Sequence, residues 1–160
     1  MIRLLLVDDE REIVDWLYDL FQGVEDLELD VYKALSGYEA LDILDRTKVD
    51  VVVSDIRMPG LGGLQLLERI RSRWPACRVI FLTGYNEFDY VYTAIKYEGV
   101  GYLLKTEDDE VIVGQVRKAI AELEQSSQDR DMMEKVRQYM ELAIPSLQRE
   151  VIKHFILDPD

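Results

Sequence analysis

Carboxylate, hydroxyl and amine side chains stand in this sequence directly after short hydrophobic runs. In chain order they are Asp8 and Asp9 after residues 2–7, Asp55 after residues 51–54, Thr83 after residues 78–82, and Lys105 after residues 100–104. Clustered carboxylates repel one another unless a cation lies among them. Carboxylate oxygens without His or Cys ligands suit Mg²⁺, which keeps several waters and commonly binds phosphate groups. These residue types therefore predict magnesium-dependent phosphate chemistry, provided that the fold brings them together.

The run that ends at Asp55 indicates where that chemistry takes place. Val51-Val52-Val53 is an unbroken β-branched run, which is typical of a strand buried on both faces of a parallel sheet. The following Met-Pro-Gly-Leu-Gly-Gly cannot continue a strand, because Pro lacks a backbone donor and Gly favours turns. Asp55 is thus expected at the carboxyl end of a buried strand, where ligands bind in open α/β sheets.

Strand and helix patterns alternate five times along the chain. Strands are expected at residues 2–7, 27–35, 51–54, 78–82 and 100–104, and helices at residues 13–21, 36–44, 64–74, 86–99 and 106–125. Gly23 and Pro75 mark helix ends, and Ser36 with Glu39 has the spacing of a capping box. This order predicts an α/β fold, with one parallel sheet between two helix layers.

The pattern changes after Gln125. Residues 126–130 contain no apolar side chain, and then apolar residues recur at nearly heptad spacing: Met133, Val136, Met140, Ile144, Leu147 and Val151. Either this segment is a coiled coil or helix pair that makes a homodimer, or it is a helix that folds back onto the preceding domain or onto a further one. Pro145 would kink or break the helix. We therefore divide the chain into a domain at residues 1–124 and a helical linker at residues 125–160.

Composition excludes several classes of function. The formal net charge of −13 opposes direct binding to nucleic acids or anionic membranes. We expect a cytoplasmic protein, because the sequence has neither a long apolar run nor a signal peptide. Cys77 has no partner for a disulfide and is expected to pack as a small apolar residue. A single His excludes metal sites built from several histidines.

Four motifs resemble those of response-regulator receiver domains in two-component signalling, over roughly residues 1–124. They are Val7-Asp8-Asp9-Glu10, Asp55-Ile56-Arg57-Met58-Pro59, Leu82-Thr83-Gly84 and Tyr102-Leu103-Leu104-Lys105. The resemblance implies a flavodoxin-like five-stranded parallel sheet of order 2-1-3-4-5 with helices on both faces, followed here by a C-terminal helical extension.

The resemblance also implies a role for each motif residue. Asp55 would accept a phosphoryl group from a sensor histidine kinase, and Asp8, Asp9, Asp55 and the backbone carbonyl of Arg57 would hold Mg²⁺. Lys105 and Thr83 would contact the phosphoryl group, and Tyr102 would turn inward as Thr83 moves. The surface of the fourth helix, fifth strand and fifth helix would change shape, and the aromatic residues Tyr85, Phe88, Tyr90, Tyr92 and Tyr97 crowd this region. Such a module is not an enzyme, apart from catalysing its own phosphorylation and dephosphorylation.

Two positions depart from the family pattern. Thr106 stands where members usually have Pro, and a cis bond before a non-proline residue costs about 2.5–4 kcal/mol. Arg57 stands two residues after the acceptor, where a side chain can lean over the phosphoryl group. Aspartyl phosphatases need an acid at that place, so Arg57 argues against a phosphatase. A phosphorylation-independent dimerisation scaffold is the second alternative.

The segments Leu-Leu-Lys-Thr-Glu-Asp and Leu-Gln-Arg-Glu resemble regulators that carry an AraC-type DNA-binding domain. No basic recognition helix is present in the sequence. DNA would thus be bound only through a further C-terminal domain, and no part of the sequence indicates membrane binding.

Overall fold

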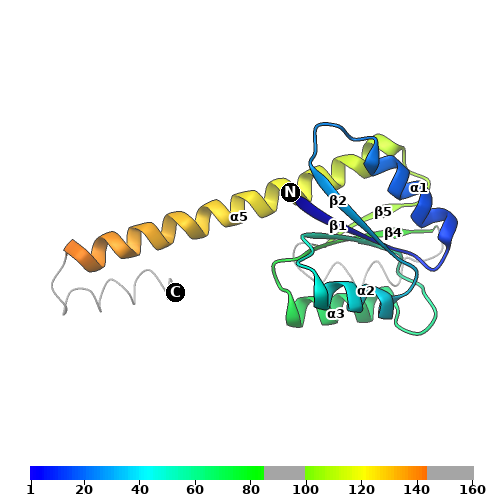
Figure 1. Cartoon of the computed structure of the whole chain (residues 1–160), viewed down its shortest axis with the longest axis horizontal. Helices are drawn as coiled ribbons and strands as arrows, with labels where there is room; N and C mark the ends of the chain where they lie inside the picture. The colour runs from blue at the N-terminus through cyan, green and yellow to red at the C-terminus, as the bar shows by residue number, and fades with distance from the viewer. Residues whose placement is uncertain (85–99, 144–160) are drawn as a thin grey trace. The chain divides into compact units, whose positions relative to one another are not determined.

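The computed structural model of the chain describes residues 1–84 and 100–143. Its five strands form one parallel sheet in the order β2-β1-β3-β4-β5, which confirms the predicted fold and strand order (Figure 1). The strands are β1 Ile2–Val7, β2 Leu29–Ala34, β3 Val51–Ser54, β4 Arg78–Thr83 and β5 Val100–Leu104. The reversal of strand order between β1 and β3 is a switch point, and ligands bind at such points in open sheets.

Helices cover both faces of the sheet. The described helices are α1 Arg11–Gln22, α2 Gly37–Arg46, α3 Gly63–Arg73 and α5 Asp109–Ala143. Figure 1 shows α1 and the first turns of α5 over one face, and α2 and α3 over the other. The helix expected at residues 86–99, and with it the aromatic residues from Tyr85 to Tyr97, lies outside the described residues.

Strand β3 lies at the centre of the hydrophobic core. Every residue of β3 is buried, as expected for a strand covered on both faces. Its last residue, Ser54, pairs in register with Val7 of β1 and with Phe81 of β4. The carboxyl ends of these three strands therefore lie side by side at one edge of the sheet.

Helix boundaries largely follow the expected signals. Helix α1 ends at Gly23, and Ser36 caps α2 by accepting a hydrogen bond from the backbone N–H of Glu39 at 3.1 Å. The Glu39 carboxylate accepts from the N–H of Leu35, at 3.4 Å, rather than from that of Ser36. The N-terminus of α2 is thus capped by its own first turn, although not as a full capping box.

Helix α5 is longer than predicted. The expected helix spanned residues 106–125, with a separate helical segment after it, but one helix runs from Asp109 to Ala143. The prediction was wrong because residues 115–143 contain neither Gly nor Pro, so the polar segment at residues 126–130 does not stop a helix. The contacts of the chain divide it into two compact units, residues 1–121 and 122–160.

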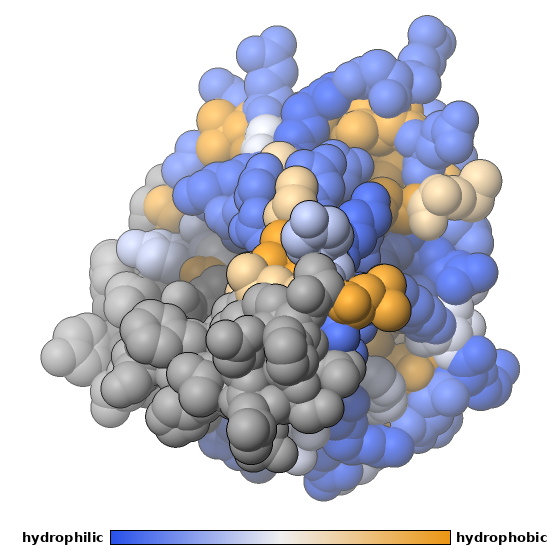
Figure 2. All heavy atoms as spheres, turned by 90° about the vertical axis from the view of Figure 1, so that its left-hand side faces the viewer, coloured by the Kyte–Doolittle hydropathy of each residue, from blue (hydrophilic) through white to orange (hydrophobic). Residues whose placement is uncertain are grey.

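The face of the molecule drawn in Figure 2 is predominantly polar among the described residues. On the face that Figure 2 draws, hydrophilic side chains dominate and hydrophobic ones show in small separate areas. Among the described residues, no helix has the length and apolar character needed to cross a bilayer.

Candidate functional site

Three carboxylates meet at the switch point of the sheet. The backbone N–H of Asp55 donates to the Val7 oxygen at 2.9 Å, so Asp55 continues the β1–β3 pairing by one residue beyond β3. Asp8 is anchored in the same way, through its N–H to the oxygen of Ala34 at 3.2 Å. One carboxylate oxygen from each of Asp8, Asp9 and Asp55 lies within 4.8 Å of the others. Asp8 and Asp55 are buried, and Asp9 is exposed. This set of oxygen ligands could hold a hard divalent cation.

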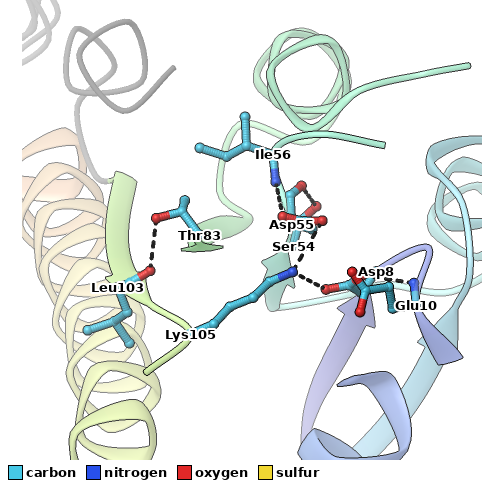
Figure 3. A network of polar contacts seen from close by, with 8 residues as sticks. All are labelled: Asp8, Glu10, Ser54, Asp55, Ile56, Thr83, Leu103 and Lys105. Carbon is cyan, nitrogen blue, oxygen red and sulfur yellow. Dashed lines mark hydrogen bonds and ion pairs between the residues drawn. The ribbon is translucent and has the colours of Figure 1, made fainter. Parts of the chain in front are cut away.

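The ammonium group of Lys105 lies against two of these carboxylates. Its Nζ is 3.1 Å from Asp8 Oδ2 and 3.4 Å from Asp55 Oδ2 (Figure 3). The backbone N–H of Lys105 donates to the Thr83 oxygen at 2.7 Å, which places the residue at the end of β5 beside β4. Residues far apart in the sequence thus come together because each of them follows a parallel strand.

Burial and neighbouring charges shift the pKa values of Asp8 and Lys105 in opposite directions. Burial raises the pKa of Asp8 above its ordinary value, and the Glu10 N–H and the Lys105 charge only partly offset this rise. Burial alone would lower the pKa of Lys105, but the neighbouring carboxylates of Asp55 and Asp8 outweigh it and raise that pKa. The two carboxylates therefore favour the charged form of Lys105, whereas burial disfavours the charged form of Asp8.

The carboxylate of Asp55 is oriented by the peptide group that follows it. The N–H of Ile56 donates to Asp55 Oδ1 at 2.9 Å, while Oδ2 faces Lys105. The buried hydroxyl of Ser54 donates to the backbone oxygen of Asp55 at 2.8 Å. Gly63 lies so close that an added Cβ would be 2.4 Å from that oxygen. Sequence reasoning missed Ser54 and Gly63; the only signals were a hydroxyl that ends a run of valines and a Gly-Gly pair before a helix.

Thr83 and Tyr102 are on neighbouring strands. Thr83 is buried, and its hydroxyl donates to the Leu103 oxygen at 3.4 Å. The Tyr102 side chain is 45% exposed and so faces solvent. The expected inward turn of Tyr102 stays a prediction about another state of the domain.

Arg57 and Thr106, the two residues that depart from the family pattern, both lie in described parts of the structure. Arg57 is exposed and lines a surface cavity of about 620 Å³ together with the following loop and the start of α3. Asp8, Asp9 and Asp55 do not line this cavity, so the acidic cluster is a separate feature. Every described peptide bond is trans, including the bond from Lys105 to Thr106.

The sheet order defines a flavodoxin-like α/β domain, and an acidic cluster lies at its switch point. The family model of the response regulator receiver domain matches residues 4–117. The chain therefore belongs to this family, and residues 4–117 form the receiver domain of a two-component response regulator.

Similar proteins agree with this assignment. The chain is 33% identical over 123 residues to the uncharacterized transcriptional regulatory protein YesN of Bacillus subtilis (strain 168), covering 77% of this chain and 33% of that protein. It is 34% identical over 132 residues to the transcriptional regulatory protein HptR of Staphylococcus aureus (strain NCTC 8325 / PS 47), covering 81% of this chain and 51% of that protein. The chain therefore spans a third to about half of the length of these curated relatives.

A solved structure of similar fold belongs to a regulator of the predicted type. The two-component transcriptional regulator AraC from Clostridium phytofermentans ISDg matches with a TM-score of 0.70 and 29% identity, covering 78% of this chain and 97% of that one. A receiver domain protein from Clostridium thermocellum matches with a TM-score of 0.69 and 30% identity, covering 76% and 96%.

Proposed function

We propose that this chain is a phosphorylation-activated switch in which Asp55 accepts a phosphoryl group from a sensor histidine kinase. The observation that carries the proposal is the contact of Asp55 with both a carboxylate cluster and the Lys105 ammonium, at the end of a buried strand. Burying a charged carboxylate costs free energy, so its presence at this position favours a functional role over a purely structural one. It also lies at the switch point, which is where ligands bind in open α/β sheets.

The transfer needs no co-reactant beyond the phosphorylated kinase. A carboxylate oxygen of Asp55 attacks phosphorus, the phosphorus–nitrogen bond of phosphohistidine breaks, and its electron pair goes to the imidazole nitrogen. The product on Asp55 is an acyl phosphate. Lys105, already 3.4 Å from Asp55 Oδ2, would stabilise the negative charge that accumulates on the phosphoryl oxygens.

The acidic cluster fits Mg²⁺ as its cofactor. Its donors are hard carboxylate oxygens, and the single charge of Lys105 cannot neutralise three carboxylates. We expect Asp8, Asp9 and Asp55, with the backbone carbonyl of Arg57, to hold the ion. When bound, Mg²⁺ supplies positive charge to the phosphoryl oxygens during transfer.

The proposed response begins at Thr83. About two negative charges on Asp55 would attract the Thr83 hydroxyl away from the Leu103 oxygen, and Tyr102 would then turn inward. The changed surface would control a transcriptional output. The names of the relatives support this output, and an AraC-type DNA-binding domain is our specific proposal for it. With a net charge of −13, we do not expect the chain itself to bind DNA.

The test is the intact mass of the protein after incubation with Mg²⁺ and acetyl phosphate. We expect the wild type to gain one phosphoryl group and Asp55→Ala to gain none. Asp42→Ala, which removes an exposed carboxylate of α2, is the matched control and should react like the wild type. A folded wild type that gains no mass would contradict the proposal.

Exposed apolar residues on α5 favour a second candidate, a dimerisation scaffold that works without phosphorylation. Met132, Tyr139 and Leu142 are 63%, 74% and 90% exposed, respectively. Met133, Val136 and Met140 are the part of the predicted heptad seam within the described residues, and they follow one another at spacings of three and four residues, so they line one side of a helix. A second copy of the chain would cover this side as a coiled coil. Sedimentation with and without beryllofluoride tests this, because equal dimerisation in both states would support the scaffold.

A further inference from the structure

Ser54 is a polar side chain inside the hydrophobic core. It is the last residue of β3, is only 1% exposed, and pairs with Val7 and Phe81, which both belong to the apolar core. Burial of a hydroxyl is unfavourable unless it forms a hydrogen bond. Apolar residues are the usual occupants of such a position, so the presence of a hydroxyl needs a physical reason.

The hydroxyl acts on the peptide group between Asp55 and Ile56. It donates to the oxygen of that peptide at 2.8 Å, and the N–H of the same peptide donates to Asp55 Oδ1 at 2.9 Å (Figure 3). Both polar ends of one peptide group are therefore engaged. Because the peptide is planar, a hydrogen bond that fixes the direction of its oxygen also fixes the direction of its N–H.

Packing restricts the same peptide group further. An added Cβ on Gly63 would lie 2.4 Å from the Asp55 oxygen and 2.8 Å from the Ile56 Cα, so α3 begins in direct contact with it. The Gly63 N–H donates to the Ile56 oxygen at 2.7 Å. These contacts limit how far the backbone can translate, and the Ser54 hydroxyl holds the orientation of the peptide plane.

We propose that Ser54 is a positioning residue that holds the Asp55 carboxylate in one rotamer through the intervening peptide group. With Oδ1 bound to the Ile56 N–H, Oδ2 faces Lys105. The proposal rests on the proposed function of Asp55 as the phosphoryl acceptor. Loss of the hydroxyl lets the peptide plane rotate, so the carboxylate spends less time in the reactive orientation.

Ser54→Thr and Ser54→Val are the main test, because these side chains have nearly the same shape and differ in the hydroxyl. Phosphorylation rates are measured with acetyl phosphate and Mg²⁺ by intact mass. We expect the Val variant to react about three- to tenfold more slowly than the Thr variant, the size of effect that one neutral hydrogen bond produces. Ser54→Ala, which cannot clash with the core, should be slowed like the Val variant.

The amide resonance of Ile56 gives a readout that packing alone would not move. In the wild type and the Thr variant we expect the downfield proton shift of an N–H bound to a carboxylate. In the Val and Ala variants this resonance should move upfield. Ser36→Ala, which removes a hydroxyl-to-backbone hydrogen bond at the start of α2, is the control for a general loss of stability and should change neither the rate nor the Ile56 resonance.

Two negative outcomes are distinguishable. Equal rates and equal Ile56 shifts for Ser54→Thr and Ser54→Val, with a reactive wild type, overturn the positioning role and leave the phosphoryl acceptor intact. A folded wild type that takes up no phosphoryl group overturns the proposed function, and the positioning role falls with it.

Discussion

The Thr83 hydroxyl donates a hydrogen bond to the main-chain oxygen of Leu103 across 3.4 Å, which joins the ends of β4 and β5. At this length the bond is weak, since hydroxyl donors normally lie 2.5–3.0 Å from their acceptors. A weak bond at a buried position can be exchanged for a stronger one at low cost. This is the property that a residue needs if it is to move toward a new charge on Asp55.

Thr83→Val should abolish the response of Tyr102 while it changes the free energy of unfolding only slightly. The substitution preserves the shape of the side chain, and because the lost bond is long we expect the free energy of unfolding to fall by about 1 kcal/mol or less. The change in the Tyr102 ring signals on adding Mg²⁺ and beryllofluoride, followed by NMR, should be lost. Thr83→Ser, which keeps the hydroxyl, should retain it. A full Tyr102 response in the Val variant would exclude Thr83 as the link.

Gly63→Ala and Gly114→Ala should change stability in opposite directions. The Cβ at position 63 would meet the Asp55 oxygen at 2.4 Å, whereas nothing lies within 4 Å of a Cβ at position 114. We expect Gly63→Ala to destabilise the domain by about 1–3 kcal/mol, as overpacking does. Gly114→Ala, inside α5, should stabilise it by up to about 1 kcal/mol. Urea unfolding measures both, and similar effects of the two variants would contradict the close contact at Gly63.

The placement of the acidic cluster follows from local sequence signals. A hydrophobic run that stops at Asp8, Asp55 or Lys105 marks the end of a strand, and the parallel order of the sheet then brings these ends together. The strand order came from the resemblance to receiver domains, and it is confirmed. The strand–helix alternation alone predicted only a parallel sheet between two helix layers. The role assigned to each side chain came from resemblance and stays a prediction.

Other features depend on contacts that no local pattern encodes. The hydrogen bond from Ser54 to the Asp55 oxygen depends on the rotation of one peptide plane, and the need for Gly63 depends on how closely α3 approaches β3. The length of α5 was underestimated for another reason. The helix was expected to end at a polar stretch, although polar residues cost a helix only about 0.7 kcal/mol each or less, so α5 continues through it.

The Cys77 thiol should be unreactive in the folded domain. Burial raises its pKa to about 12, against an ordinary value of 9.0. At pH 8 the folded protein then holds about a thousandfold less thiolate than the unfolded chain, and the thiolate is the reacting species. We expect slow labelling by a disulfide reagent in buffer and fast labelling in urea. Fast labelling in buffer would show that β4 opens locally near its start.

Asp8→Asn should stabilise the metal-free domain in a pH-dependent way. Because burial raises the Asp8 pKa above 3.8, the folded state binds the Asp8 proton more tightly than the unfolded state does. Near pH 7 the wild type therefore carries an unfavourable buried charge that the Asn variant lacks. The advantage of the variant should shrink as the pH falls through the raised pKa, because the wild type then takes up its proton.

Urea unfolding between pH 4 and pH 7 with a chelator present measures this difference, with the exposed Asp42→Asn as control. Adding Mg²⁺ near pH 7 should make the wild type more stable than Asp8→Asn. An ion that binds the folded wild type stabilises it, and the variant has lost one carboxylate ligand. An advantage for Asp8→Asn that stays constant across this pH range would mean that burial does not raise the Asp8 pKa. An advantage unaffected by Mg²⁺ would mean that Asp8 does not hold the ion.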